Sequence, residues 1–260
     1  MVFVFRKNQF SQHYGRCSLK AVFFLLFAAM CFSLFPQSSV PDTSWQVPNG
    51  AVHAFAVDGN YTYIGGSFTA IGKNTGNGAK LTATSAVPDY SFPKVAGTIF
   101  AAEYDSLGRL YIAGNFTQVG KYTRLRIARF NTNGTLDTTW DPKADAVVYS
   151  LVIHRGSIYI GGDFLQVNGS VSRNRLAKLN METGAVDPSW NPNANGYVRV
   201  LMPEGDLMYA GGLFTTLNGS VARKYIARLN LTAGTVDGSW DPDCNNTVYA
   251  ININGSDVYI

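Results

Sequence analysis

The sequence is poor in the residues that build active sites. Only 15% of its 260 residues are charged, and of its three histidines only His53 and His154 lie beyond residue 40. It contains no Gly-x-Ser-x-Gly nucleophile elbow, no Cys/His metal spacing and no Gly-rich phosphate loop. Cys17 and Cys31 precede residue 40, so Cys244 alone remains and no internal disulfide is expected. We therefore expect a protein that is not an enzyme, with no cofactor, no metal site and no catalytic residue.

Excess basic charge is also missing from most of the chain. The formal net charge of +4 rests on Arg6, Lys7, Arg16 and Lys20, because residues 1–40 contain no acid. Removing these four from the 21 Lys and Arg leaves 17 bases against the 17 Asp and Glu of the remainder. A neutral remainder argues against nucleic acid as a partner, since that partner needs a net basic surface.

Long apolar runs are absent except near the N-terminus. Lys20 precedes an apolar run at residues 21–35, which is shorter than the roughly 20 residues of a membrane-spanning helix. A basic start, this run and a polar exit are typical of a signal-peptide helix, predicted at residues 1–39. The protein is then secreted or displayed at the cell surface, with no membrane span in the mature chain. The alternative is a membrane anchor formed by residues 21–35.

What the sequence does contain is a repeat of about 50 residues. The aromatic residue of a Tyr-Ile-Gly-Gly run recurs at intervals of 48, 48, 50 and 50, at Tyr63, Tyr111, Tyr159, Tyr209 and Tyr259. An Asp-x-x-Trp motif recurs at intervals of 47, 48, 50 and 50, ending at Trp45, Phe92, Trp140, Trp190 and Trp240. Because two unrelated motifs keep one period, residues 42–260 are predicted to form a tandem array.

Each unit consists of four short β-type runs separated by turns that contain Gly. The first run, such as residues 147–152, is apolar at nearly every position, which is typical of a strand buried on both faces. No helical period of useful length follows residue 40. Four antiparallel strands in each unit predict an all-β fold, a β-propeller built of four-stranded blades. The alternative, a β-solenoid, has shorter coils and lacks Asp-Gly hairpin turns such as Asp58-Gly59.

Two features of the repeat predict how the blades pack. The paired glycines, such as Gly161-Gly162, indicate a bulge or a place where another backbone lies too close for a Cβ. Ala113-Gly114 is a mild variant of this pair. The closing Trp or Phe of each unit is expected to supply the large contacts between neighbouring blades.

The motifs also support a family resemblance. Residues 159–169 (YIGGDFLQVNG), residues 175–180 (RLAKLN) and the closing residues 187–190 (DPSW) resemble the delta-60 repeat of bacterial exported β-propeller proteins, and the glycine placement is distantly similar to kelch repeats. The resemblance covers residues 42–260 and implies the fold. It implies no catalytic residue, because the family has no established activity. Phe92 in place of Trp and a weak third run near residues 77–82 depart from the pattern.

The array ends within a unit. From Asp42 there are four whole units and only the first two strands of a fifth, which stops at Ile260. A terminal repeat normally caps an array or completes a shared blade. We therefore expect the sequence to be an N-terminal fragment or a truncated reading frame of a longer protein.

One varied position in the first run of each unit suggests a binding site. Ten residues before each marker tyrosine the occupants are His53, Ala101, Tyr149, Arg199 and Tyr249. In a propeller the first strand is innermost, so His53, Tyr149, Arg199 and Tyr249 are candidates for hydrogen bonding and stacking at a shallow binding site near the central channel. The alternative is that they fill space between fixed apolar neighbours.

Other candidate positions have simpler interpretations. The alternating oxygen ligands of residues 241–245 are more typical of a turn than of a calcium loop. The bases Arg129, Lys178 and Arg228 are expected to pair with acids of the repeat. Glu103, the acid inside an apolar first run, has no predicted catalytic partner.

The function predicted from the sequence is an exported, non-enzymatic β-propeller that serves as a protein or glycan binding module. The alternatives are a propeller enzyme, such as a hydrolase, lyase or oxidoreductase, with its site on rim loops or in missing blades, or a purely structural repeat segment of a surface protein. The fold cannot decide between them, because propellers have many functions.

Overall fold

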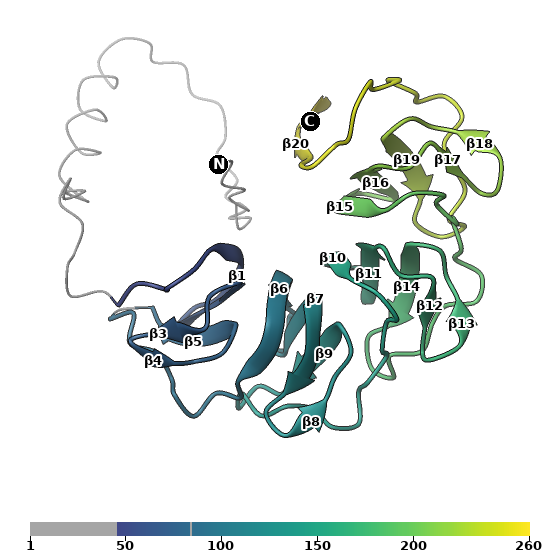
Figure 1. The fold of residues 1–260 in the computed structure, drawn as a ribbon. Coiled ribbons are helices and arrows are strands. Elements are labelled where there is room, and N and C mark those ends of the chain that lie inside the picture. Colours follow the sequence, from purple (N-terminus) through teal and green to yellow (C-terminus); the bar gives the residue numbers. More distant parts are fainter. Residues whose placement is uncertain (1–45, 84) are drawn as a thin grey trace, which may run out of the picture. The chain divides into compact units, whose positions relative to one another are not determined.

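The computed structural model describes residues 46–83 and 85–260 (Figure 1). The chain divides into two units, Met1–Ser44 and Trp45–Ile260, and the described residues belong to the second. The predicted signal peptide at residues 1–39 and the alternative anchor at residues 21–35 lie outside the described residues. Within the described ranges every regular element is a β-strand, and no helix is long or apolar enough to cross a membrane.

Four antiparallel sheets succeed one another along the chain, and each begins with the apolar first run of a repeat. The strands of the first two sheets are β1 (Val52–Asp58), β2 (Tyr61–Gly66) and β5 (Gly78–Thr82), then β6 (Val95–Tyr104), β7 (Leu110–Val119) and β9 (Ile127–Phe130). Those of the next two are β10 (Val148–His154), β11 (Ser157–Gly162) and β14 (Leu176–Asn180), then β15 (Val198–Glu204), β16 (Leu207–Gly212) and β19 (Ile226–Asn230). In every sheet the second strand lies in the middle.

The connection between the second and third strands, predicted as a turn between two β-type runs, forms a small hairpin of its own. The hairpin strands are β3 (Ala70–Ile71) with β4 (Lys73–Asn74), the end of β7 with β8 (Tyr122–Thr123), β12 (Gln166–Val167) with β13 (Val171–Ser172), and β17 (Thr216–Leu217) with β18 (Val221–Ala222). The last pair is β20 (Asn252–Asn254) with β21 (Asp257–Tyr259).

The predicted fourth strand is shorter than expected. In each sheet the fourth run contributes one antiparallel bridge to the third strand, as Phe130 does with Leu136 and Leu179 does with Val186. The chain leaves this register because the next residues form a turn around an aspartate. Asp187, for example, accepts hydrogen bonds from the backbone N–H and the hydroxyl of Ser189 at 2.9 and 2.6 Å. The sheets are therefore three-stranded with a fourth run attached at one point.

Consecutive sheets pack face to face. Figure 1 shows the first strands β1, β6, β10, β15 and β20 following one another on the same side of their sheets, and each contacts the next in this series. In each repeat the two marker aromatics pack against each other. Tyr159 and Trp190 meet edge to face at 5.3 Å between ring centroids, in a cluster with Val198 and Phe214 of the following sheet. The closing aromatic thus lies between sheets, as predicted.

The paired glycines have two different packing roles, and both follow from the lack of a Cβ. A Cβ on Gly161 would lie 2.8 Å from the Val198 side chain of the next sheet. A Cβ on Gly162 would overlap the backbone carbonyl oxygen of Val147, within the same sheet. The first glycine therefore permits close packing between sheets, and the second permits the irregular pairing of the first two strands.

Candidate functional site

The first strand of each sheet has a β-bulge at the same point. Val148 pairs with Gly162 and Ser150 with Gly161, so Tyr149 is left without a partner in the register. A bulge of this kind turns one side chain away from the regular alternation of the strand. The same irregularity leaves His53, Phe100 and Arg199 unpaired in β1, β6 and β15.

A fifth residue occupies the equivalent position of the last repeat. Tyr249 follows Val248, whose side chain packs over Gly211 as that of Val198 packs over Gly161. Tyr249 lies before β20, and 67% of its surface is exposed. We call His53, Phe100, Tyr149, Arg199 and Tyr249 the bulge row.

Neighbouring members of the bulge row are in contact across all five repeats. The ring centroids of His53 and Phe100 are 5.4 Å apart, and those of Phe100 and Tyr149 are 5.5 Å apart. The guanidinium carbon of Arg199 lies 4.1 Å from the ring centroid of Tyr149 and 5.7 Å from that of Tyr249. The structure therefore brings the four predicted site residues into one continuous line of stacking groups.

In the second repeat the count of ten residues from the marker tyrosine does not reach the bulge. Ala101 stands ten positions before Tyr111, but it pairs with Ala113 inside the strand, and Phe100 occupies the bulge. The cause is a longer hairpin, because Tyr111 pairs with Glu103, eight positions earlier, whereas Tyr159 pairs with Val152, seven positions earlier. Counting forward from the β-branched residue before the bulge would have identified Phe100.

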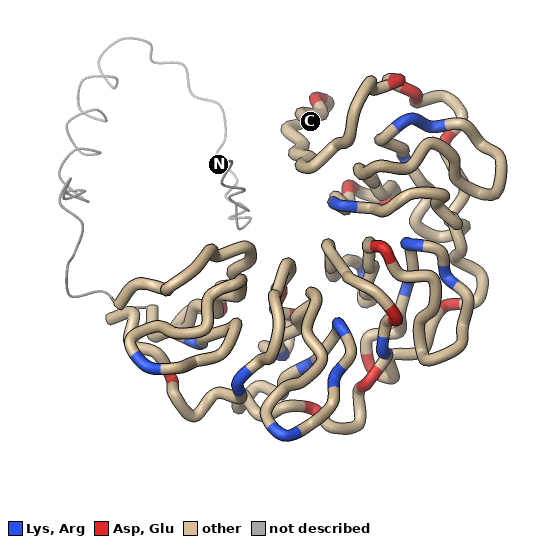
Figure 2. Tube along the Cα trace, in the orientation of Figure 1, with Lys and Arg blue, Asp and Glu red and all other residues tan. Residues whose placement is uncertain are grey.

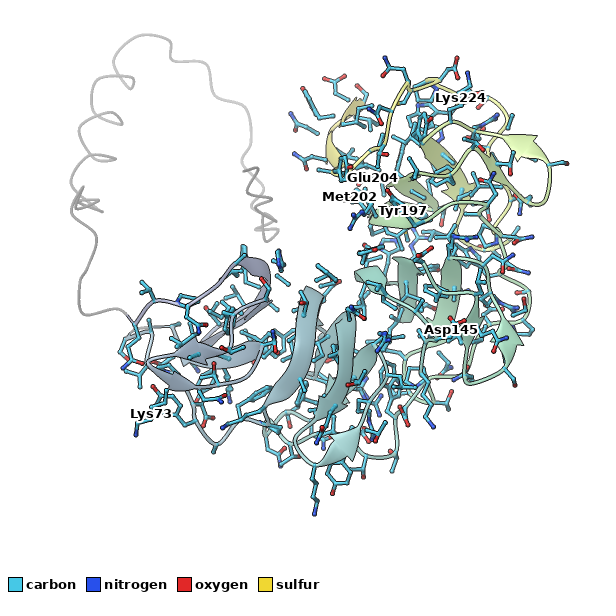
Figure 3. The ribbon with its side chains drawn as sticks, viewed as in Figure 1. Lys73, Asp145, Tyr197, Met202, Glu204 and Lys224 are labelled. Atoms are coloured by element: carbon cyan, nitrogen blue, oxygen red, sulfur yellow. The ribbon has the colours of Figure 1, made fainter. Side chains whose placement is uncertain are left out.

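Sequence reasoning also missed Tyr197, which extends the row on one side. Tyr197 precedes β15, and Figure 3 labels it at this strand. Its ring centroid lies 6.1 Å from that of Tyr149 and 5.2 Å from the guanidinium carbon of Arg199. Three tyrosine rings therefore surround the Arg199 guanidinium. No repeat period marks Tyr197, so only its proximity to Arg199 identifies it.

Arg199 differs from the other arginines of the described array because each of those makes an ion pair with an acid or, like Arg126 and Arg173, a hydrogen bond to a backbone carbonyl. Among the described residues its side chain makes no ion pair and no hydrogen bond, and its Nε is buried without a partner. Arg129 and Arg228, by contrast, lie 2.5 and 2.7 Å from the carboxylates of Asp137 and Asp237. The predicted pairing of the third-strand bases within the repeat is therefore present, while Arg199 stays available.

The strongly shifted carboxylates lie away from the bulge row and have structural causes. Burial would raise the pKa of Asp187, but hydrogen bonds from Ser189 and Lys178 outweigh it and lower the pKa to about 2. Asp137 has a pKa of about 2 by the same balance, with Thr139 and Arg129 as donors. These groups are ionised turn-forming acids, which do not suit general acid catalysis.

The remaining candidate positions are also occupied by structural contacts. Asp241 lies 3.1 Å from Arg223, and Asp243 lies 3.1 Å from Lys224, so both carboxylates of residues 241–245 form ion pairs with bases. The part of the chain that the structure describes holds no group of three or more His, Cys, Asp or Glu side chains arranged for a metal. Glu103 accepts a hydrogen bond from the backbone N–H of Ile153 at 3.0 Å and so links two consecutive sheets.

Comparison with known proteins agrees with the architecture. A family model described as "Domain of unknown function (DUF5122) beta-propeller" matches residues 108–139 and 156–189. Together with the antiparallel sheets, this match shows a β-propeller type of fold. A search of curated proteins found no match.

Two solved structures have a similar chain path. One is the computationally designed Ika4 protein, with 10% identity over 72% of this chain and 95% of that chain and a TM-score of 0.48. The other is described as the extracellular domain of a hybrid two-component system from B. thetaiotaomicron, with 14% identity over 84% of this chain and a TM-score of 0.47. The matched part is 26% of that second chain.

Proposed function

We propose that this chain is an exported, non-enzymatic β-propeller of the delta-60 repeat type that binds a protein or glycan through its bulge row. The observation that carries the proposal is the contact of five bulge residues from five successive repeats. A bulge that places a stacking or hydrogen-bonding side chain at one level in every repeat suits a long, shallow binding surface. The basic and apolar pattern of residues 20–39 supports export.

The use of the other polar groups supports binding over catalysis. The loop acids that follow the closing aromatics take part in ion pairs or turns: Asp141 lies 3.4 Å from Lys143, and Asp145 accepts hydrogen bonds from the backbone N–H groups of Leu165 and Gln166. Hydrolysis by paired carboxylates needs two acids that are free to exchange protons. Residues already committed to turns do not meet this need.

The test is to compare the purified full chain with its Tyr249→Ser variant on arrays of glycans and of surface proteins. Tyr249 is exposed and lies outside the strands, so the variant is expected to fold like the parent protein, which thermal unfolding checks. We expect a ligand whose affinity falls at least about fivefold in the variant, the loss of one stacking contact of about 1 kcal/mol. Binding that is unchanged in the variant, or no binding at all, would contradict the proposal.

A further inference from the structure

Arg199 is the one Lys or Arg in the first strands of the described sheets. β1, β6 and β10 contain no Lys or Arg, and neither do residues 248–254. The acids of these strands, Asp58, Glu103 and Glu204, lie three to five positions beyond the bulge, toward the hairpin. In Figure 2 the first strands are mostly uncharged. The level of the bulge row therefore has a single positive centre.

The surroundings of Arg199 leave its donors without partners. Tyr149, Tyr197 and Tyr249 approach the guanidinium at 4.1 to 5.7 Å from the ring centroids and stabilise its charge by cation–π contact. Aromatic rings cannot accept the in-plane N–H groups of guanidinium as a carboxylate does. An arginine held by rings, with no acid in contact, presents its terminal N–H groups for a bidentate contact with a planar anion.

The backbone of the same strands argues against an extended peptide as the ligand. A peptide that adds to a sheet binds through free N–H and C=O groups at a strand edge. The N–H of Ile153 in β10 already donates to Glu103, and the N–H of Leu201 in β15 donates to the Ser150 hydroxyl at 3.1 Å. Recognition at this level therefore depends on side chains, namely aromatic rings and one guanidinium.

We infer that Arg199, together with Tyr149, Tyr197 and Tyr249, binds the carboxylate of an acidic carbohydrate, so that the ligand of the bulge row is a glycan containing uronic acid. The inference rests on the proposed binding function and adds the chemical class of the ligand. Sugar rings present apolar C–H faces that stack on aromatic side chains, and a uronic acid adds one planar carboxylate to such a face. In the bulge row, aromatic rings that can stack on the sugar lie next to the guanidinium that can bind its carboxylate.

The test uses the full chain and a matched pair of probes, an oligogalacturonate of defined length and its carboxyl-reduced, neutral counterpart, measured by isothermal titration calorimetry. We expect the acidic sugar to bind at least about tenfold more tightly than the neutral one, the effect of one charge-assisted hydrogen-bonded pair. Arg199→Gln should abolish this difference, and Arg199→Lys should restore part of it, because lysine supplies charge without the bidentate geometry.

Two further variants separate the possible outcomes. Lys121→Gln is the control, because Lys121 is a second base that lies near a tyrosine ring, 5.4 Å from the ring centroid of Tyr122. This variant should leave the affinities for the acidic and the neutral sugar unchanged. Tyr249→Ser should weaken the acidic and the neutral sugar alike. Thermal unfolding of Arg199→Gln and Tyr249→Ser should match that of the parent protein, which excludes loss of folding as the cause.

Three results would overturn the inference. If both sugars bind equally and Arg199→Gln does not change their affinities, the proposed binding function is retained, but recognition of a carboxylate is rejected. If an acidic peptide of equal charge binds with the same dependence on Arg199 while neither sugar binds, the ligand is a protein and the carbohydrate is rejected. No binding of either sugar would reject the acidic glycan. Array binding that does not depend on the bulge row, or no array binding at all, would reject the proposed function itself.

Discussion

At the scale of single residues, the recurring aspartates of the repeat form turns and pair with the bases of the third strands. Asp137, Asp187 and Asp237 each begin the closing motif, accept hydrogen bonds from the Ser or Thr two residues later and pair with the base of the third strand. The recurrence of Asp in the motif is therefore explained by turn formation. Arg199, unlike Arg129 and Arg228, has no acid in contact, and its guanidinium is instead surrounded by tyrosine rings, which makes it a candidate for ligand binding.

The hydrogen bonds and ion pairs of these aspartates predict that the free energy of unfolding depends on pH. The pKa of Asp187 is lowered to about 2 in the folded protein and is near 4 in an unfolded chain, so its contribution is fully present above about pH 4 and is lost as the pH falls through about 2. Asp187→Asn should lower the free energy of unfolding at pH 7. The difference from the parent protein should shrink between about pH 4 and pH 2.

Urea unfolding at pH 7, 4 and 2.5 measures this difference. Asp257→Asn is the matched control, because Asp257 is exposed in β21 and makes no ion pair among the described residues. The control should shift the unfolding midpoint little at any of the three pH values. A constant difference between Asp187→Asn and the parent protein across the range would show that the hydrogen bonds to Asp187 do not favour its ionised form.

At the scale of elements, much of each sheet could be predicted from the sequence. The apolar first run, the Gly turns and the Tyr-Ile-Gly-Gly run specify three strands because they encode burial, turn geometry and close packing locally. The fourth strand was predicted too long, since the same Asp motif that marks the repeat turns the chain out of the sheet. The hairpins between second and third strands were missed because two-residue strands such as β12 leave no periodic signal.

The candidate site was predicted only in part for a related reason. The spacing to a marker tyrosine reaches the bulge at His53, Tyr149 and Arg199, since their hairpins have equal length. One added residue in the hairpin after β6 moved the count from Phe100 to Ala101. A bulge is defined by pairing between two strands, and fixed counting along one strand does not reveal that pairing.

The two adjacent glycines of the second strand are expected to differ in how much an alanine substitution destabilises the protein. Gly162→Ala should lower the free energy of unfolding by about 3 kcal/mol or more, because the new methyl would overlap the carbonyl oxygen of Val147 in the paired backbone. Gly161→Ala should cost about 1 kcal/mol, since it meets the movable side chain of Val198 and the second repeat carries Ala113 at this place.

Urea denaturation of the two variants tests this ranking. Gly238→Ala is the matched control, because no atom lies within 4 Å of a Cβ at Gly238 and its backbone is not in the left-handed region. It should leave the unfolding midpoint nearly unchanged. Equal losses at Gly161 and Gly162 would mean that the sheets separate to accommodate either methyl, contrary to the distinct roles assigned to the two glycines.

At the scale of the whole array, each sheet is stabilised by its sequence neighbours. The extensive contacts between sheets join consecutive members only: β1 and β2 with β6, β6 and β7 with β10, and β10 and β11 with β15. The large aromatics follow the same rule, since Trp140 packs with Tyr111 of one sheet and Ile160 of the next. Stability in such an array is close to a sum of sheet terms and nearest-neighbour terms.

This arrangement predicts how a local defect spreads. Native-state hydrogen exchange of Gly162→Ala should show faster exchange in β11, its own sheet, and a smaller increase in β7 and β16 of the two adjoining sheets. The amides of β2, two sheets away, should exchange as in the parent protein, because they share no extensive contact with the altered sheet. Gly238→Ala should leave all of these strands unchanged. If exchange accelerates equally in β2 and β16, the described residues unfold as one cooperative unit. The bulge row would then be stabilised by all the described sheets and not only by the sheets next to each of its members.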